Sequence, residues 1–286
     1  MRNLALSAIV ALFAALILFS GCKPPQNPIT LNTNLDVCVY DPECTEKMAL
    51  GHRGTGAYNL WVTENTLYAY EYAWEMGADS VEIDVRETKD GELVIMHNAT
   101  VDFTTNGKGN VSDMTLAEVK ALKIYSVNPG VPVQSVPTFK EALEFIKGKM
   151  LVDLDLKSRE IAKIISEIEE AGMINSAYLG IDSLAEADLA RSINPDTAIM
   201  PKVATIDEAR EYVENASPIA FFEIEYANAT PELVDYIHSN GIKIHINSLT
   251  TYDLLGQVGF KIVFDRGADI IQTDRLDILV PYINSL

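Results

Sequence analysis

The chain has 286 residues, of which 48% are hydrophobic and 22% are charged. This composition supplies enough apolar material for a folded core and excludes disorder as the main state. The 41 acidic residues outnumber the 22 basic ones, giving a formal net charge of −19 at pH 7. Such a chain repels phosphate backbones, which argues against nucleic acid as a partner. Any phosphate ligand would need a metal ion or locally placed cations.

Residues 1–21 have the pattern of a secretory signal peptide. Arg2 is followed by an apolar stretch of roughly 16 residues, shorter than the ~20 that a membrane-spanning helix needs, so a cleaved signal is favoured over a transmembrane helix. Ser20 and Gly21 before Cys22 resemble the lipobox of bacterial lipoproteins. That resemblance implies cleavage before Cys22 and lipidation of its thiol. We therefore expect an exported lipoprotein tethered to a bacterial membrane.

Residues 22–47 are expected to form the tether, and residues 48–286 a catalytic domain. Pro, Asn and Thr are frequent in the first part of the tether, which is typical of a flexible linker. Cys38 and Cys44 follow, and an exported location permits a small-loop disulfide between them. A metal pair is the alternative, but no histidine or further cysteine lies nearby in the sequence.

After the tether, short apolar β-rich runs alternate with amphipathic stretches that begin and end with helix caps. Thr115 and Glu118 form a capping box, and Thr230-Pro231 begins a helix that Gly241 ends. This alternation predicts an α/β fold with a parallel sheet. The nine predicted strands are 49–52, 80–86, 92–97, 150–157, 177–181, 198–203, 219–225, 243–247 and 269–273.

The second and third predicted strands are joined by four residues, too few for a helix. The Asp90-Gly91 signal indicates an antiparallel hairpin that would place His97 opposite Asp84. Eight strands then remain, the number in a (β/α)8 or TIM barrel. Residues 101–138 are expected to form an elaborated loop before the third barrel strand. Such loops lie over the carboxyl-terminal face, where barrel enzymes have their active sites.

Alternation along a strand places side chains two residues apart on one face. Glu82 and Asp84 share a face of one predicted strand, and Asp153, Asp155 and Lys157 share a face of another. Paired carboxylates on a buried strand are costly unless a cation neutralises them, and Mg²⁺ and Ca²⁺ prefer such oxygen ligands. The pattern predicts a divalent metal site, the alternative being a solvated acidic edge strand. Lys157 would contact phosphate or form a structural ion pair.

Two of the four histidines, His52 and His97, end predicted strands. Either alone would more often be structural, but two at strand ends near a metal suit a general acid and a general base. Arg53 is well suited to bind a phosphate oxygen through its guanidinium fork. Glu223 and Glu225 form a further pair that would add a metal ligand or only hydrogen-bond within the barrel mouth.

Several motifs of this chain resemble, in order and spacing, those of the glycerophosphodiester phosphodiesterase family. The resemblance runs from about residue 50 to the C-terminus, most densely up to residue 120. The matching segments are GHRG (51–54), TENT (63–66), EIDV (82–85), TKDG (88–91), His97, TTNGKG (104–109), LDLK (154–157) and GADIIQTD (267–274).

This resemblance implies a (β/α)8 barrel that hydrolyses glycerophosphodiesters to sn-glycerol 3-phosphate and an alcohol with one divalent cation, Mg²⁺ or Ca²⁺. The matching positions imply metal ligands at Glu82, Asp84 and Asp155, catalytic histidines at His52 and His97, phosphate contacts at Arg53 and Lys157, and a supporting role for Glu64.

Four positions depart from the family pattern. Asp155 stands where Glu is usual, Asn98 where Asp is usual, Phe103 where Arg is common and Ile244 where Trp is frequent. None removes a primary acid or base, so we expect activity and leave the substrate open. The alternatives are the same chemistry on a lysophospholipid or a phosphoglycerol-decorated glycan, and a lipoprotein that binds phosphodiesters without turnover.

Overall fold

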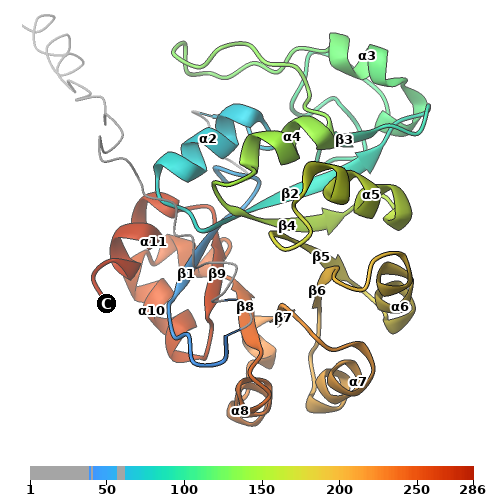
Figure 1. The fold of residues 1–286 in the computed structure, drawn as a ribbon. Helices are drawn as coiled ribbons and strands as arrows, with labels where there is room; N and C mark the ends of the chain where they lie inside the picture. Colours follow the sequence, from blue (N-terminus) through green and yellow to red (C-terminus); the bar gives the residue numbers. More distant parts are fainter. Residues whose placement is uncertain (1–38, 40, 57–61) are drawn as a thin grey trace, which may run out of the picture.

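The structure, a computed structural model, describes residues 39, 41–56 and 62–286 (Figure 1). The predicted signal peptide, the lipidation site Cys22 and Cys38 lie outside the described residues. Cys44 takes part in a disulfide bond, and its pairing with Cys38 stays a prediction. Among the helices of the described part, none combines the length and the apolar character needed to span a bilayer.

The described strands form one sheet, in which eight run parallel around a nearly closed barrel and one, β3, pairs antiparallel with β2. The order around the barrel is β6-β5-β4-β2-β1-β9-β8-β7. A bridge between Lys202 and Glu223 links β6 to β7. The predicted (β/α)8 barrel is confirmed. The strands are β1 Met48–Gly51, β2 Ser80–Glu87, β3 Leu93–Ile95, β4 Leu151–Leu156, β5 Ala177–Ile181, β6 Ala198–Pro201, β7 Phe221–Glu223, β8 Lys243–Asn247 and β9 Ile270–Thr273.

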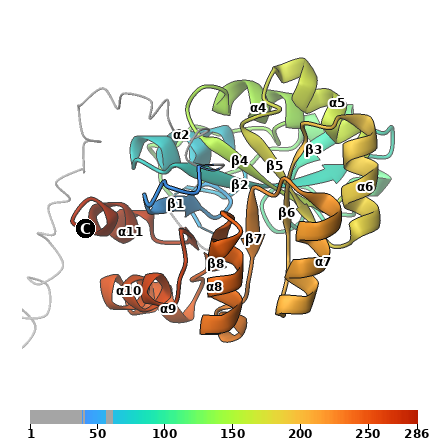
Figure 2. The ribbon, with the colours of Figure 1, turned by 60° about the horizontal axis from the view of Figure 1, so that its bottom comes forward.

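Helices cover the outside of the barrel, as Figures 1 and 2 show from two directions. Outward strand residues such as Val81, Ile83 and Leu154 are buried against them, so the inward positions are left for the interior and the site. The predicted caps are present: Thr115 and Glu118 form a capping box, and Thr230 caps the helix that Pro231 begins. The helices are α2 Leu67–Glu75, α3 Leu116–Ala121, α4 Phe139–Ile146, α5 Ile161–Ala171, α6 Leu184–Ile193, α7 Ile206–Ala216, α8 Pro231–Ser239, α9 Thr251–Leu254, α10 Gln257–Asp265 and α11 Leu276–Ile283.

The β2–β3 hairpin exists, but its predicted register is wrong by one residue. The backbone N–H of Met96 donates to the carbonyl of Asp84, so Met96, and not His97, lies opposite Asp84. The cause is the turn, whose loop is residues 89–91 and not the expected two residues. Gly91 adopts a φ of +82°, a left-handed conformation that permits the three-residue loop.

The elaborated segment between β3 and α4 is also present. It contains the 3₁₀ turn Val111–Asp113 and α3, and it buries a small core of its own that includes Val101 and Val119. Figure 1 shows α3 beyond the hairpin, away from the barrel axis. Thr104 and Ile124 line a small recess beside His97, so this segment borders the site described below.

Candidate active site

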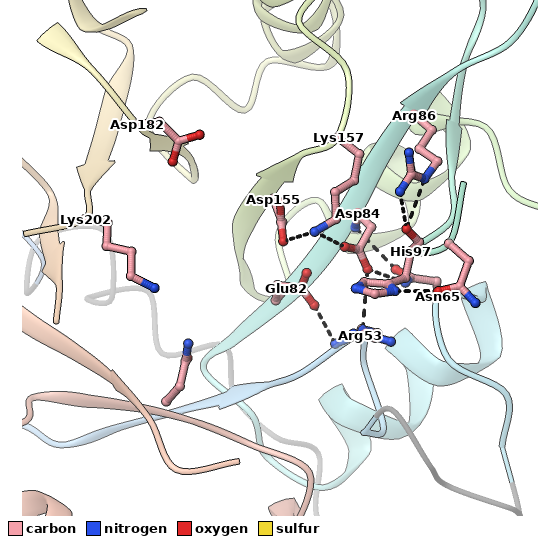
Figure 3. Close-up of polar contacts among 12 residues, drawn as sticks. Arg53, Asn65, Glu82, Asp84, Arg86, His97, Asp155, Lys157, Asp182 and Lys202 are labelled. Carbon is pink, nitrogen blue, oxygen red and sulfur yellow. Dashed lines mark hydrogen bonds and ion pairs between the residues drawn. The ribbon is translucent and has the colours of Figure 1, made fainter. Parts of the chain in front are cut away.

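A cavity of about 350 Å³ lies at the carboxyl ends of the barrel strands. One wall contains the sequence-predicted residues, and the facing wall contains Lys202, Glu223 and Asn247, as the position of Lys202 in Figure 3 illustrates. This end of a (β/α)8 barrel is where the loops of eight strands can contribute side chains to one site. The predicted residues that line the cavity directly are His52, Arg53, Glu82, His97 and Asp155.

Three carboxylates meet beside this cavity, where Glu82 and Asp155 line it and Asp84 is buried. Glu82 and Asp84 lie on β2, and Asp155 lies beside Asp84 because β2 and β4 pair in parallel with these two residues in register. One oxygen from each of the three lies within 4.8 Å of the others. Burial, followed by the charges of Asp84 and Asp155, raises the pKa of Glu82 well above its ordinary value. The cluster therefore needs positive charge nearby.

Lys157 supplies one such charge. Its ammonium lies 2.5 Å from Asp155 Oδ2 and 3.4 Å from Asp84 Oδ1 (Figure 3). Burial lowers the pKa of Lys157, but the hydrogen bond that its ammonium donates to Asp155 and the charge of Asp84 outweigh that effect and raise the pKa. Lys157 thus forms an ion pair with two of the three predicted metal ligands, and it stays charged at neutral pH.

Arg53 approaches the carboxylates from the β1 side. Its backbone N–H donates to Glu82 Oε2 at 2.8 Å, and its guanidinium lies 3.0 Å from Glu64 Oε1 and 3.6 Å from Asp84 Oδ2. Glu64 is therefore placed to orient Arg53. Sequence reasoning missed Asn65, which donates from Nδ2 to Asp84 Oδ2 at 2.7 Å. The position of Asn65 next to Glu64 in the TENT motif could have indicated that it belongs to the site.

His52 pairs with a carboxylate that sequence reasoning also missed. Its Nδ1 lies 2.7 Å from Asp274 Oδ1. Gly51 and Thr273 are paired in the parallel β1–β9 ladder, so the residues that follow them meet at the strand ends. The buried carboxylate of Asp253 accepts from the backbone N–H of Asp274 at 2.8 Å and holds that segment.

His97, unlike His52, has an uncharged amide as the hydrogen-bond partner of its ring. Its Nδ1 lies 2.8 Å from Oδ1 of the neighbouring residue Asn98. Burial lowers the pKa of His97, and the hydrogen bond that Asn98 Oδ1 accepts from its ring and the charge of Asp84 only partly oppose this effect. Arg86 donates to the backbone carbonyl of His97. Burial thus favours the neutral form of His97, and hydrogen bonds hold both its ring and its backbone.

The facing wall explains the second acidic pair. Lys202 lies 2.8 Å from Glu225 Oε1 and 3.4 Å from Glu223 Oε1, and Asn247 donates to Glu223 Oε1 at 3.1 Å. Glu223 and Glu225 therefore hydrogen-bond within the mouth, and neither is among the three clustered carboxylates of the described residues. Lys202 was not singled out in the sequence.

A (β/α)8 barrel that gathers acidic, basic and imidazole side chains at its carboxyl end belongs to the class of barrel enzymes. The sequence model of the glycerophosphoryl diester phosphodiesterase family matches residues 52–278 of this chain. The chain therefore belongs to this family of phosphodiesterases.

Individual relatives agree with this assignment. A glycerophosphodiester phosphodiesterase of Bacillus subtilis (strain 168) is 28% identical over 228 residues, which cover 69% of this chain and 75% of that protein. A glycerophosphodiester phosphodiesterase of Caldanaerobacter subterraneus subsp. tengcongensis is 42% identical over 113 residues. That match covers 39% of this chain and 45% of the relative, less than half of its length.

Solved structures show the same fold. A glycerophosphodiester phosphodiesterase from Agrobacterium tumefaciens superimposes with a TM-score of 0.69 at 25% identity, over 82% of this chain and 99% of that one. A phosphodiesterase of Oleispira antarctica, in complex with the product sn-glycerol-3-phosphate, gives a TM-score of 0.67 at 23% identity, over 83% of this chain and 96% of that one.

Proposed function

We propose that this protein hydrolyses glycerophosphodiesters to sn-glycerol 3-phosphate and an alcohol, with a divalent cation and two histidines. One observation carries the proposal: two carboxylates of the cluster Glu82, Asp84 and Asp155, those of Glu82 and Asp155, line the same cavity as His52 and His97. Family membership and the product bound to the Oleispira antarctica structure support the choice of substrate.

The carboxylate cluster fits one hard cation, Mg²⁺ or Ca²⁺. Its donors are all oxygens, and buried Asp84 Oδ1 accepts no hydrogen bond from the described residues, which leaves a lone pair for a metal. The raised pKa of Glu82, caused by burial and negative neighbours, is the effect that a bound cation would remove. Once bound, the cation would polarise the phosphoryl group and cancel charge that develops on its oxygens.

The surroundings of the two histidines support a different role for each. Asn98 Oδ1 can only accept, so Nδ1 of His97 carries a hydrogen and Nε2 keeps a lone pair in the neutral ring. His97 would therefore act as the general base toward water or a neighbouring substrate hydroxyl. The Asp274 carboxylate is a suitable partner for a positively charged His52, which would protonate the leaving alkoxide as the general acid.

Arg53 and Lys157 would hold the phosphate. Arg53 Nε is buried and has no hydrogen-bond partner among the described residues, while Glu64 fixes the other end of the guanidinium. Lys157 approaches Oδ1 of Asp84, whereas Arg53 approaches Oδ2 of the same carboxylate. Two fixed cations aimed at non-bridging oxygens would stabilise the charge of the transition state without reorganisation.

The direct test is an assay for sn-glycerol 3-phosphate release from glycerophosphocholine and glycerophosphoethanolamine. We expect turnover that a chelator abolishes and that added Mg²⁺ or Ca²⁺ restores. Absence of turnover on every phosphodiester tried, with both cations supplied, would contradict the proposal and favour a binding protein.

We also propose that the protein is an exported lipoprotein anchored through Cys22. The sequence pattern of residues 1–21 supports this, and a disulfide at Cys44 suits an oxidising compartment. Metabolic labelling with radioactive palmitate should label the wild-type protein and not Cys22→Ser. Equal labelling of the two would contradict the anchor.

A further inference from the structure

Arg86 is a basic residue near the site that the proposed chemistry does not use. It lies on β2, two residues after Asp84, is partly buried and forms no ion pair with any described residue. Its guanidinium instead donates two hydrogen bonds to one acceptor, the backbone carbonyl oxygen of His97. The bond from Nε is 3.0 Å long and the bond from Nη2 is 2.5 Å long (Figure 3).

The strand pairing explains why this carbonyl needs a side-chain donor. The N–H of Met96 donates to the carbonyl of Asp84, after which the chain leaves the edge of β2 and enters the elaborated segment. The carbonyl of His97 is therefore beyond the β2–β3 ladder. A partly buried carbonyl requires a donor, and the guanidinium offers two N–H groups in a fixed planar fork.

We infer that Arg86 is the positioning residue of His97, and that its fork fixes the backbone of His97 so that the imidazole faces the cavity. This inference rests on the proposed role of His97 as general base. Asn98 holds the ring at Nδ1, and Arg86 holds the carbonyl of the same residue. Two anchors on one residue compensate for the loss of strand pairing at this point.

Arg86 also carries a charge near the carboxylate cluster. Burial lowers the pKa of Arg86, and the charges of Asp84 and Asp155 act in the opposite direction. A loss of function on its removal could therefore come from the missing fork or from the missing charge. The fork and the charge are separated by comparing Arg86→Met, which removes both, with Arg86→Lys, which keeps the charge and lacks the planar fork.

The experiment measures kcat and KM for release of sn-glycerol 3-phosphate by wild type, Arg86→Lys and Arg86→Met. We expect kcat of both variants to fall, by about 10- to 100-fold for Arg86→Met, with little change in KM, because a displacement near 1 Å at a catalytic group has this effect. The matched control is Arg191→Met. Arg191 also donates to backbone carbonyls, those of Ser217 and Pro218, and lies outside the cavity lining.

A second measurement is independent of turnover. The imidazole NMR resonances of His97, assigned with His97→Gln, should shift or broaden in Arg86→Met, while those of His238 stay unchanged. If wild type has no activity, the proposed function fails and these resonances still test the inference. Wild-type kcat together with unchanged His97 resonances in Arg86→Met would overturn it. An equal loss of kcat in Arg191→Met, or full activity in Arg86→Lys, would overturn it as well.

Discussion

His52 Nδ1 and Asp274 Oδ1 lie 2.7 Å apart, although 222 positions separate the two residues along the chain. The parallel β1–β9 register brings them together, and Asp253 fixes the backbone of Asp274. A carboxylate held in this way orients the imidazole and selects which nitrogen faces the cavity. Asp274 is therefore expected to matter for catalysis although it does not line the cavity.

Asp274→Asn should lower kcat at least about tenfold, because an amide can pair with either imidazole tautomer and does not support a charged ring. The measurement is steady-state kinetics of sn-glycerol 3-phosphate release. Asp277→Asn is the control, since Asp277 lies just beyond and forms an exposed ion pair with Arg275. Equal kcat in wild type and Asp274→Asn would remove Asp274 from the proposed mechanism.

Asp84→Asn should weaken binding of Mg²⁺ or Ca²⁺ at least about tenfold, because it removes one charged oxygen from the cluster while keeping the side-chain shape. Isothermal titration calorimetry of the cation measures this directly. Asp182→Asn serves as the control, since Asp182 lines the same cavity but is ion-paired with Arg159. A dissociation constant that Asp84→Asn leaves unchanged would place the cation elsewhere.

The acid limb of the pH profile should respond to Asn98. As a general base, His97 acts when neutral, so kcat/KM falls as the pH drops through a pKa that burial holds below the ordinary 6.5. Asn98→Asp would stabilise the protonated ring and move this limb to higher pH, by about one unit. Asn128→Asp introduces the same charge in an exposed turn and should leave the profile in place. If the acid limb stays at the same pH in Asn98→Asp, the group that titrates in it is not His97.

Asp79 should make stability depend on pH. Burial raises its pKa from 3.8 to about 6, while its Oδ2 accepts from the N–H of Ala49. The folded state therefore binds the proton more tightly than the unfolded state, and stability falls as the pH rises from about 4 through 6. Asp79→Asn keeps an acceptor for Ala49 and avoids this loss.

Urea unfolding should thus show Asp79→Asn to be more stable than wild type by about 1–3 kcal/mol near pH 8, with the difference nearly absent near pH 4. Asp265→Asn, which changes an exposed carboxylate paired with Lys261, controls for the general effect of removing an acid. A difference of equal size at both pH values would exclude ionisation of Asp79 as the cause.

The barrel was predictable because its signals are local. Strand alternation, the Thr115 capping box and the Thr230-Pro231 helix start depend on neighbours within a few residues, and all appear in the structure. The convergence of Glu82, Asp84 and Asp155 followed from the same alternation, once β2 and β4 are neighbours. The register of the hairpin was less accessible, because it depended on the backbone conformation of Gly91.

The contacts missed in the sequence are long-range or involve groups that motifs do not describe. Asp274 reaches His52 only through the β1–β9 seam, and Lys202 meets Glu223 only where β6 approaches β7. Arg86 acts on a backbone carbonyl, which has no sequence signature. Glu223 could not be assigned from its strand alone, because its role depends on that lysine.

The pairing of β1 with β9 also affects the order in which the site forms during biosynthesis. A nascent chain that lacks β9 has no partner for that edge of β1 and no carboxylate for His52. The imidazole of His52 can be oriented only after β9 and Asp274 have been synthesised, so a chain truncated before β9 lacks this part of the site. Assembly of the site around His52 therefore depends on a residue that is synthesised 222 positions later in the chain.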